Sequence, residues 1–343
     1  MRAWLLFVTV VISVSSGCAS TINLEVLRPA ALAVPREVQT IAVVDRSKAK
    51  NFGQGLLGAI EGALTGEEIG ADTEGRASAR QGLAQSLALS PRFNVVTPSL
   101  TPRGADSSLF DTADLSWRQA RRICQRSNCE GIVTLEAFDS DKVDDVQVGE
   151  RTETVDGKER TVRTFEVERR LSVLTSWRLY DVPNQQVLDD LRETSFSRSW
   201  TSSGDTREAA FAGLPSQTQM VSNVAFEAGR AYGQRIAPSY VWVSRRYFGR
   251  GDPTFKEARS RVRGLDWDGA AKLWRRLRKS DDPKLRGKAF FNLALFHEVN
   301  GRLDMAMQQA QRANRLLDRG LTRRYVSTLA YRKAEEARLD EQL

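Results

Sequence analysis

The chain has 343 residues, which is enough for two domains, and its 41% hydrophobic and 27% charged residues are typical of a globular protein. It carries 51 Lys and Arg against 43 Asp and Glu, a net charge of +8. With one histidine, His297, and three cysteines, the composition offers too few side chains for a zinc site and disfavours a serine-histidine triad. We therefore expect no metal, no cofactor and no enzymatic activity.

Residues 1–17 have the layout of a secretory signal peptide. Arg2 supplies a positive charge, residues 3–14 form an apolar run broken only by Thr9 and Ser13, and small residues then lead into Cys18. The run is shorter than the roughly 20 apolar residues that span a bilayer. A cleaved signal is therefore favoured over an uncleaved membrane helix.

The small residues directly before Cys18 resemble the lipobox of bacterial lipoproteins, in which the cysteine is lipidated and becomes the new N-terminus. Ser15 departs from the pattern, because the family usually has an aliphatic residue there. By resemblance to lipoprotein sorting rules, Ala19 after the cysteine implies an outer-membrane lipoprotein facing the periplasm. A basic periplasmic protein meets anionic envelope components before nucleic acid, so we expect no nucleic-acid partner.

Residues 18–35 are predicted to be a tether in which alternate apolar residues resemble an edge strand. Residues 36–250 then have the strand and helix alternation of an α/β domain. Gly53, Gly55 and Gly58 match G-x-G-x-x-G, but several residues separate them from the preceding strand, so a loop is favoured over a nucleotide site. The predicted strands are 38–45, 93–97, 131–138, 146–155, 161–180, 187–200 and 240–243, with helices at 75–90, 112–124 and 220–236 and a hairpin turn at Asp156 and Gly157.

Two cysteines five residues apart lie between a predicted helix and a predicted strand. In an oxidising periplasm Cys124 and Cys129 could close a short loop as a disulfide, and the alternative is two buried thiols. Their spacing differs from the C-x-x-C of redox sites. We favour the disulfide.

Residues 254–343 are predicted to be an all-α module. The spacing of small and apolar residues resembles tetratricopeptide repeats, with one whole repeat at 285–318, a weaker copy before it and a capping helix at 321–339. The resemblance implies that Asn292 bonds the backbone of a bound peptide; the alternative is an Asn on an exposed helix face. His297 occupies the aromatic position of the repeat and is expected to be a packing residue. The matching positions are Asn292, Leu293, Ala294, His297, Gly301, Ala306, Ala310 and Ala313 in the whole repeat, and Trp267, Ala270, Trp274 and Leu277 in the weaker copy.

The mixed-sheet α/β (α+β) half resembles the domain of the curli-secretion and penicillin-binding-protein-activator lipoproteins. The resemblance lies in TIAVVD, SPRFNVV, GIVTLEAF and SWRLYDVPNQQVL. LRPA at 27–30, AVVDRS at 42–47, LTGEE at 64–68 and LEAFDSD at 135–141 resemble an uncharacterised family of bacterial lipoproteins with C-terminal tetratricopeptide repeats. That likeness covers most of the mature chain and implies no known activity.

The sequence is compatible with three functions. The favoured one is a membrane-anchored, non-catalytic scaffold that binds a protein or peptide through its repeats. The alternative is an oligomeric component of an envelope export assembly, in which residues 51–75 or the 146–167 hairpin become membrane-spanning strands, although that hairpin is too charged for a lipid-facing band. An enzyme that uses paired carboxylates is least favoured, since acidic runs are usually solvated; its candidates are Glu67, Glu68 and Asp72, or Asp139, Asp141, Asp144 and Asp145.

Overall fold

The computed structural model describes residues 19–47, 70–98 and 114–343. Cys18, the three glycines of the G-x-G-x-x-G match, Glu67 and Glu68 lie outside the described residues. The described chain forms two compact units. The α/β unit contains residues 27–240 and 338–343, and the helical unit contains residues 19–26 and 241–337.

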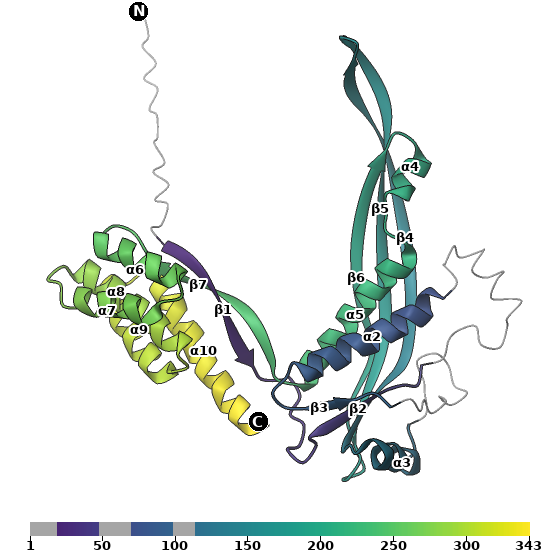
Figure 1. Cartoon of the computed structure of the whole chain (residues 1–343), viewed down its shortest axis with the longest axis horizontal. Coiled ribbons are helices and arrows are strands. Elements are labelled where there is room, and N and C mark those ends of the chain that lie inside the picture. The colour runs from purple at the N-terminus through teal and green to yellow at the C-terminus, as the bar shows by residue number, and fades with distance from the viewer. Residues whose placement is uncertain (1–18, 48–69, 99–113) are drawn as a thin grey trace, which may run out of the picture. The chain divides into compact units, whose positions relative to one another are not determined.

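The α/β unit is built on a five-stranded mixed sheet with the order β3-β2-β4-β5-β6 (Figure 1). β2 is parallel to β3 and β4, whereas β5 is antiparallel to both of its neighbours, β4 and β6. The mixed sheet expected from the sequence is therefore present. Its strands are β2 (Thr40–Asp45), β3 (Asn94–Val96), β4 (Gly131–Val155), β5 (Lys158–Asp181) and β6 (Gln186–Gly204).

Helices cover both faces of this sheet. α2 (Ala71–Ala88) and α5 (Gln217–Ile236) pack side by side on one face, and α3 (Trp117–Ser127) packs on the other. The first two helices approach so closely that a Cβ on Gly82 would lie 2.0 Å from the carbonyl oxygen of Phe226. A side chain at that position would force the helices apart. The short helix α4 (Arg207–Ala212), which the sequence analysis missed, packs on β5 and β6.

Two strands predicted separately, at 131–138 and 146–155, are one 25-residue strand, β4. The intervening DSDKVDD has loop-like composition, but its side chains alternate between a solvated face and a face with polar partners. Ser140 donates to Asp72 of α2 at 2.5 Å, and the Lys142 ammonium lies 3.1 Å from the amide oxygen of Gln217 in α5. The strand continues because each inward polar group finds a partner on a helix.

The hairpin turn between β4 and β5 lies where the sequence predicts it. Asp156 and Gly157 both have positive φ, at 51° and 74°, as a two-residue turn of the I′ type requires. β4 and β5 stay paired up to this turn, whereas the pairing of β5 with β6 ends at Phe165 and Gly204. Residues 149–164 therefore form a two-stranded arm beyond the three-stranded part of the sheet.

The helical unit combines a two-stranded ribbon with helices. The ribbon pairs β1 (Ala19–Arg28) with β7 (Ser239–Phe248), so most of the predicted tether is a paired strand. Aromatic and small residues from β7 and every helix form one core, against which Ile22 and Leu24 of β1 pack. The helices are α6 (Pro253–Arg263), α7 (Trp267–Leu277), α8 (Pro283–Val299), α9 (Leu303–Leu317) and α10 (Gly320–Gln342). An α/β region followed by a helical region is the predicted order of fold classes.

Candidate functional site

The predicted partner-binding residue, Asn292, is completely buried in the helical unit. Its side-chain oxygen accepts a hydrogen bond from the backbone N–H of Phe248 at 2.8 Å, and its side-chain nitrogen donates to the Phe248 carbonyl at 2.7 Å. The amide thus binds extended backbone, but the backbone is that of the chain's own strand β7. Neither the exposed helix face nor a free peptide site describes its position.

A buried carboxylate fixes the same strand to two helices. Glu298 of α8 receives the guanidinium of Arg245 from β7 at 2.7 Å and the hydroxyl of Tyr325 from α10 at 2.7 Å. Burial, and next the charge of Glu298, raises the pKa of Tyr325 well above its usual value, so this phenol remains a donor at neutral pH. The Phe248 ring also packs edge-on against Phe291, with 5.3 Å between centroids. Strand β7 is therefore an integral part of the helical unit.

His297 is a partly buried neighbour of Phe296, with 5.3 Å between the two ring centroids. Burial is the largest cause that lowers the pKa of His297, and the positive charges of Arg302 and Arg275 lower this pKa further. The imidazole is therefore neutral at pH 7. Its place beside an aromatic ring fits the expected packing role.

A second group of buried charges lies in the α/β unit, where β2 ends beside β4. Arg46 and Glu136 are 4% and 3% exposed, and the Arg46 Nη1 lies 2.8 and 3.0 Å from the two carboxylate oxygens. Thr134 donates to the same carboxylate at 2.6 Å. The backbone joins the pair too, because the Arg46 N–H donates to the Leu135 carbonyl at 2.9 Å.

Arg178 of β5 extends this group of charges. Its guanidinium lies 3.9 Å from Glu136, 2.8 Å from Asp114 and 3.2 Å from Asp190. Tyr180 donates to Glu136 at 3.4 Å, and its pKa is raised by burial and next by the Glu136 charge. We call Arg46, Glu136, Arg178 and Tyr180 the buried ion cluster. This cluster was not predicted, although the sequence contains two signals of it: a lone Glu in GIVTLEAF and an Arg directly after TIAVVD.

The buried ion cluster occupies a distinctive place in the topology. β2 connects through α2 to β3 on one side, and β4 lies on its other side, so the strand order reverses at β2. Open α/β sheets bind ligands at such a point, beyond the carboxyl ends of the strands. Here β4 continues past that point, and the protein's own Arg46 and Glu136 fill it. The geometry favours a structural role for the pair.

Among the described residues, the carboxylates considered for catalysis are divided between the two faces of β4. Asp72 accepts the Ser140 hydroxyl, and Asp144 forms a two-point ion pair with Arg169 at 2.6 and 2.7 Å that, chiefly by hydrogen bonding, lowers its pKa. Since successive β4 residues alternate between faces, Asp139, Asp141 and Asp145 lie on the face opposite to Asp144.

The remaining predicted pair, Cys124 and Cys129, is joined as a disulfide between the end of α3 and the start of β4. This is the pairing that the five-residue spacing favoured over two thiols. It closes the short turn in which Asn128 has a positive φ of 50°.

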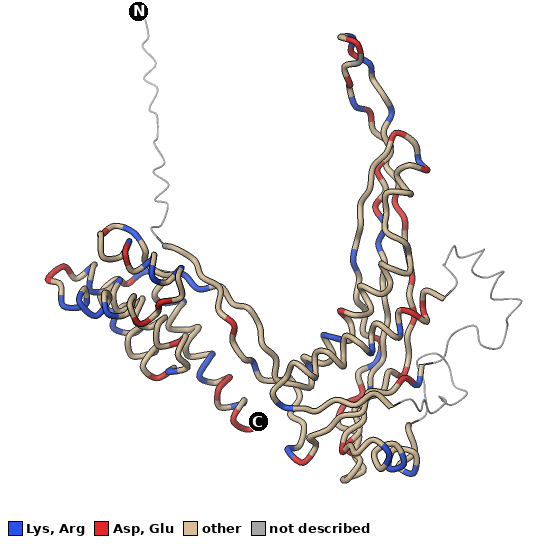
Figure 2. Tube along the Cα trace, viewed as in Figure 1, with Lys and Arg blue, Asp and Glu red and all other residues tan. Residues whose placement is uncertain are grey.

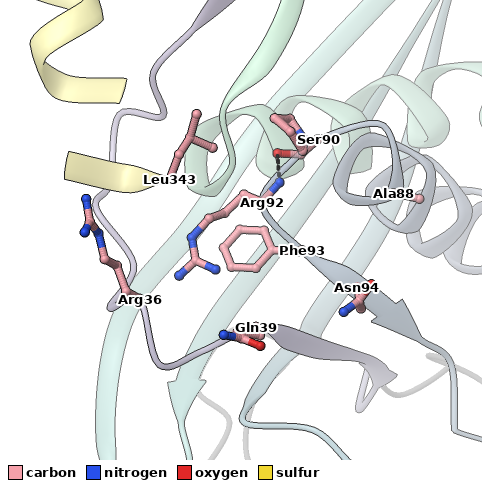
Figure 3. Close-up of a pocket in the computed structure, with 9 residues that line it drawn as sticks. Arg36, Gln39, Ala88, Ser90, Arg92, Phe93, Asn94 and Leu343 are labelled. Carbon is pink, nitrogen blue, oxygen red and sulfur yellow. Dashed lines mark hydrogen bonds between the residues drawn. The ribbon is translucent and has the colours of Figure 1, made fainter. Parts of the chain in front are cut away.

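An open pocket of about 770 Å³ lies in the α/β unit near the start of β3 (Figure 3). Arg36 donates to the backbone carbonyl of Glu341 at 3.1 Å, and Arg92 donates to that of Pro35 at 2.7 Å. Burial, and next the charge of Arg36, lowers the pKa of Arg92. The pocket is polar and solvent-facing.

The described part of the chain contains no group of three metal-ligating side chains and no helix long and apolar enough to cross a membrane.

A family model described as a domain of unknown function (DUF8603) matches residues 38–248, more than half of the chain. The chain belongs to this family. A second model, also described as a domain of unknown function (DUF6340), matches residues 256–334 in the helical unit. Thus the DUF8603 match ends at the end of β7, and the second begins within α6.

No curated protein matches the chain. Among solved structures, a crystal structure named "putative lipoprotein from Caulobacter crescentus CB15" is similar at 17% identity, covering 56% of this chain and 84% of its own. Its TM-score is 0.22, so this likeness carries no argument about the fold or function of the DUF8603 protein.

Proposed function

We propose that this protein is an envelope lipoprotein, anchored through Cys18, whose helical unit is a tetratricopeptide-type module that binds a protein partner without catalysing a reaction. The outer membrane, facing the periplasm, is the proposed location. The observation that supports this most directly is the start of β1 at Ala19, the residue after Cys18. The proposed lipid would therefore lead straight into the helical unit, with no flexible linker between anchor and module.

The charge of the helical unit defines the kind of partner. Residues 241–337 contain 23 Lys and Arg and 11 Asp and Glu, a net charge of +12, while the whole chain carries +8. Figure 2 shows these basic residues along the helices. A protein partner with an acidic surface would be attracted to this unit. Because Asn292 is bonded to Phe248, we place the partner on exposed helix surfaces such as that of Tyr331, which is 58% exposed.

Lipidation and partner binding are tested separately. Intact mass of the mature protein from its own membranes should show the acyl groups on Cys18, and the Cys18→Ala form should lack them. Cross-linking in intact cells should then join a protein to the helical unit. A Tyr331→Glu variant should lose that product, whereas Val148→Glu, at a 60% exposed position in the other unit, should keep it. An unmodified Cys18 would refute the anchor, and equal cross-linking by both variants would refute the binding surface.

The alternative, an oligomeric export component, has one observation in its favour. The arm formed by residues 149–164 projects beyond the three-stranded part of the sheet and presents backbone that another copy could contact. Its many charged side chains argue against burial in lipid. Mass measurement of the detergent-extracted protein distinguishes the two functions, because a monomer excludes the oligomeric assembly.

A further inference from the structure

Four cationic residues lie near the place where the mature chain enters the helical unit. A Cβ on Gly249 would lie 2.8 Å from both the Ser20 hydroxyl and the Cδ of Arg259, so β1 begins beside α6. Arg263 lies four residues after Arg259 in α6, so the two cations share one face of that helix. Burial raises the pKa of Tyr247 on the neighbouring strand, whereas its hydrogen bond with Ser20 and the charges of Arg263 and Arg259 lower it. The start of β1 is therefore next to the positive side of α6.

The other two cations come from the following loop and from α8. Arg250 is exposed and directly follows Gly249. The Lys288 ammonium would lie 3.5 Å from a Cβ on Gly251, and it is 5.7 Å from the Phe248 ring. We call Arg250, Arg259, Arg263 and Lys288 the entry cluster.

Arg259 and Arg263 of the entry cluster differ from Arg261 on the same helix, because no ion pair among the described residues compensates their charge. Arg261 of α6 forms ion pairs with Glu257 at 3.2 Å and with Asp266 at 2.8 Å. None of the four cluster residues belongs to an ion pair among the residues that the structure describes. α6 thus has one neutralised face and one face whose positive charge remains available to an external anion.

We propose that the entry cluster is a membrane-docking surface that binds the phosphate groups of anionic lipids beside the acylated N-terminus. This inference rests on the proposed anchorage at Cys18. Two residues of extended chain span roughly 7 Å, so the lipidated cysteine would hold Ser20 and its neighbouring cations at headgroup depth. The Debye length is about 8 Å at physiological salt, so charges within that distance still act on the membrane, although salt weakens the attraction. A lipid anchor combined with a basic patch orients a protein as well as retaining it.

The test uses the mature chain with Cys18→Ser, which has no acyl group, so its result does not depend on lipidation. Flotation with vesicles of phosphatidylethanolamine and phosphatidylglycerol is compared with flotation on pure phosphatidylcholine. We expect binding to the anionic vesicles only, and loss of binding at high salt. Changing all four cluster residues to Gln should lower the partition coefficient roughly 600-fold, because each basic residue near an anionic surface contributes about fivefold.

A matched control has the same composition. Arg275, Arg276, Arg278 and Lys279 are also three arginines and one lysine, and all are exposed at the end of α7. Their change to Gln should leave most of the lipid binding intact. Equal losses from the two variants would show attraction to net charge alone and would overturn the proposal. Absence of vesicle binding by the Cys18→Ser chain with the intact entry cluster would overturn the proposal as well. So would a cluster variant that keeps lipid binding but loses an acidic protein partner. Mass measurement of Cys18 remains a separate result, so failure of the anchor and failure of the docking surface are distinguished.

Discussion

The two units bury a carboxylate to nearly the same extent but surround it differently. Glu136 in the α/β unit is 3% exposed and Glu298 in the helical unit is 4% exposed. Glu136 shares one of its two cations with other acids, because Arg178 also pairs with Asp114 and Asp190.

Glu298 is the acidic partner of Arg245 and the hydrogen-bond acceptor of Tyr325 among the described contacts, and these two residues come from β7 and α10. Equal burial therefore does not imply equal contribution to stability. What differs is how many acidic partners the neighbouring arginines keep when the carboxylate is removed.

The largest expected effect comes from Glu298→Ala. It leaves Arg245, only 12% exposed, without its carboxylate and removes the acceptor of the Tyr325 hydroxyl. Breaking a buried pair in this way costs about 3–5 kcal/mol. Hydrogen exchange, read on peptides of the helical unit, should show faster exchange throughout that unit. Glu257→Ala, in an exposed pair on α6, is the control and should leave exchange unchanged. A variant as stable as the control would refute the role of Glu298.

Glu136→Ala should cost less, about 3 kcal/mol, the lower end for a broken buried pair. Arg178 keeps Asp114 and Asp190, so part of the cluster stays compensated. Hydrogen exchange should rise in β2 and β4 and stay unchanged in the helical unit. A loss equal to that of Glu298→Ala would contradict the distinction between shared and unshared partners.

Asn292→Ala tests whether backbone recognition within the helical unit matters for its stability. The change leaves the N–H and the C=O of Phe248 without partners, and unpaired buried groups cost about 1–3 kcal/mol each. We expect a loss of about 2–3 kcal/mol, near the lower end of the sum for two such groups. Asn300→Ala, which removes a hydrogen bond within one helix end, should cost less. Unchanged stability together with lost partner binding would instead support the peptide-binding interpretation of Asn292.

The sequence predicted most elements because apolar periodicity reports local burial. It placed the sheet strands, both large α/β helices and the helical region. The predictions were wrong where contacts between residues distant in sequence determine the local structure. DSDKVDD looked like a loop because the partners of Ser140 and Lys142 come from helices distant in sequence.

Asn292 is a related case. Its position in a repeat suggested backbone binding, but the packing of β7 against α8 determines which backbone it binds. The buried ion cluster was not predicted because a charged residue in an apolar strand indicates that an oppositely charged partner exists, but the sequence does not show which residue that partner is.

The disulfide of the α/β unit has a smaller expected effect. Cys124→Ser with Cys129→Ser removes a cross-link that closes a very short loop, for which chain-entropy arguments give about 2 kcal/mol. Urea unfolding of oxidised and reduced protein should show the same difference, and the double variant should not respond to reductant. A response to reductant in the double variant would contradict the assignment of the cross-link to these two cysteines.

The smallest effect near neutral pH, and the most specific, concerns Tyr325. Its pKa is raised in the folded state, first by burial and next by Glu298, above the value of about 10 in the unfolded chain. Its contribution to stability is therefore complete below pH 10 and is lost as the pH rises above 10 towards the folded pKa. Hydrogen exchange between pH 8 and 11, corrected for its intrinsic pH dependence, should show this loss in the helical unit.

Tyr232 supplies the comparison in the α/β unit, where burial, and next Asp189, raises its pKa in the same direction. Tyr325→Phe should flatten the alkaline loss in the helical unit alone, and Tyr232→Phe should flatten it in the α/β unit alone. If either variant changed both units equally, the two would unfold as one cooperative body, and the difference between Glu136 and Glu298 could not be read from separate units. Independent alkaline transitions would instead show that each buried carboxylate stabilises its own unit.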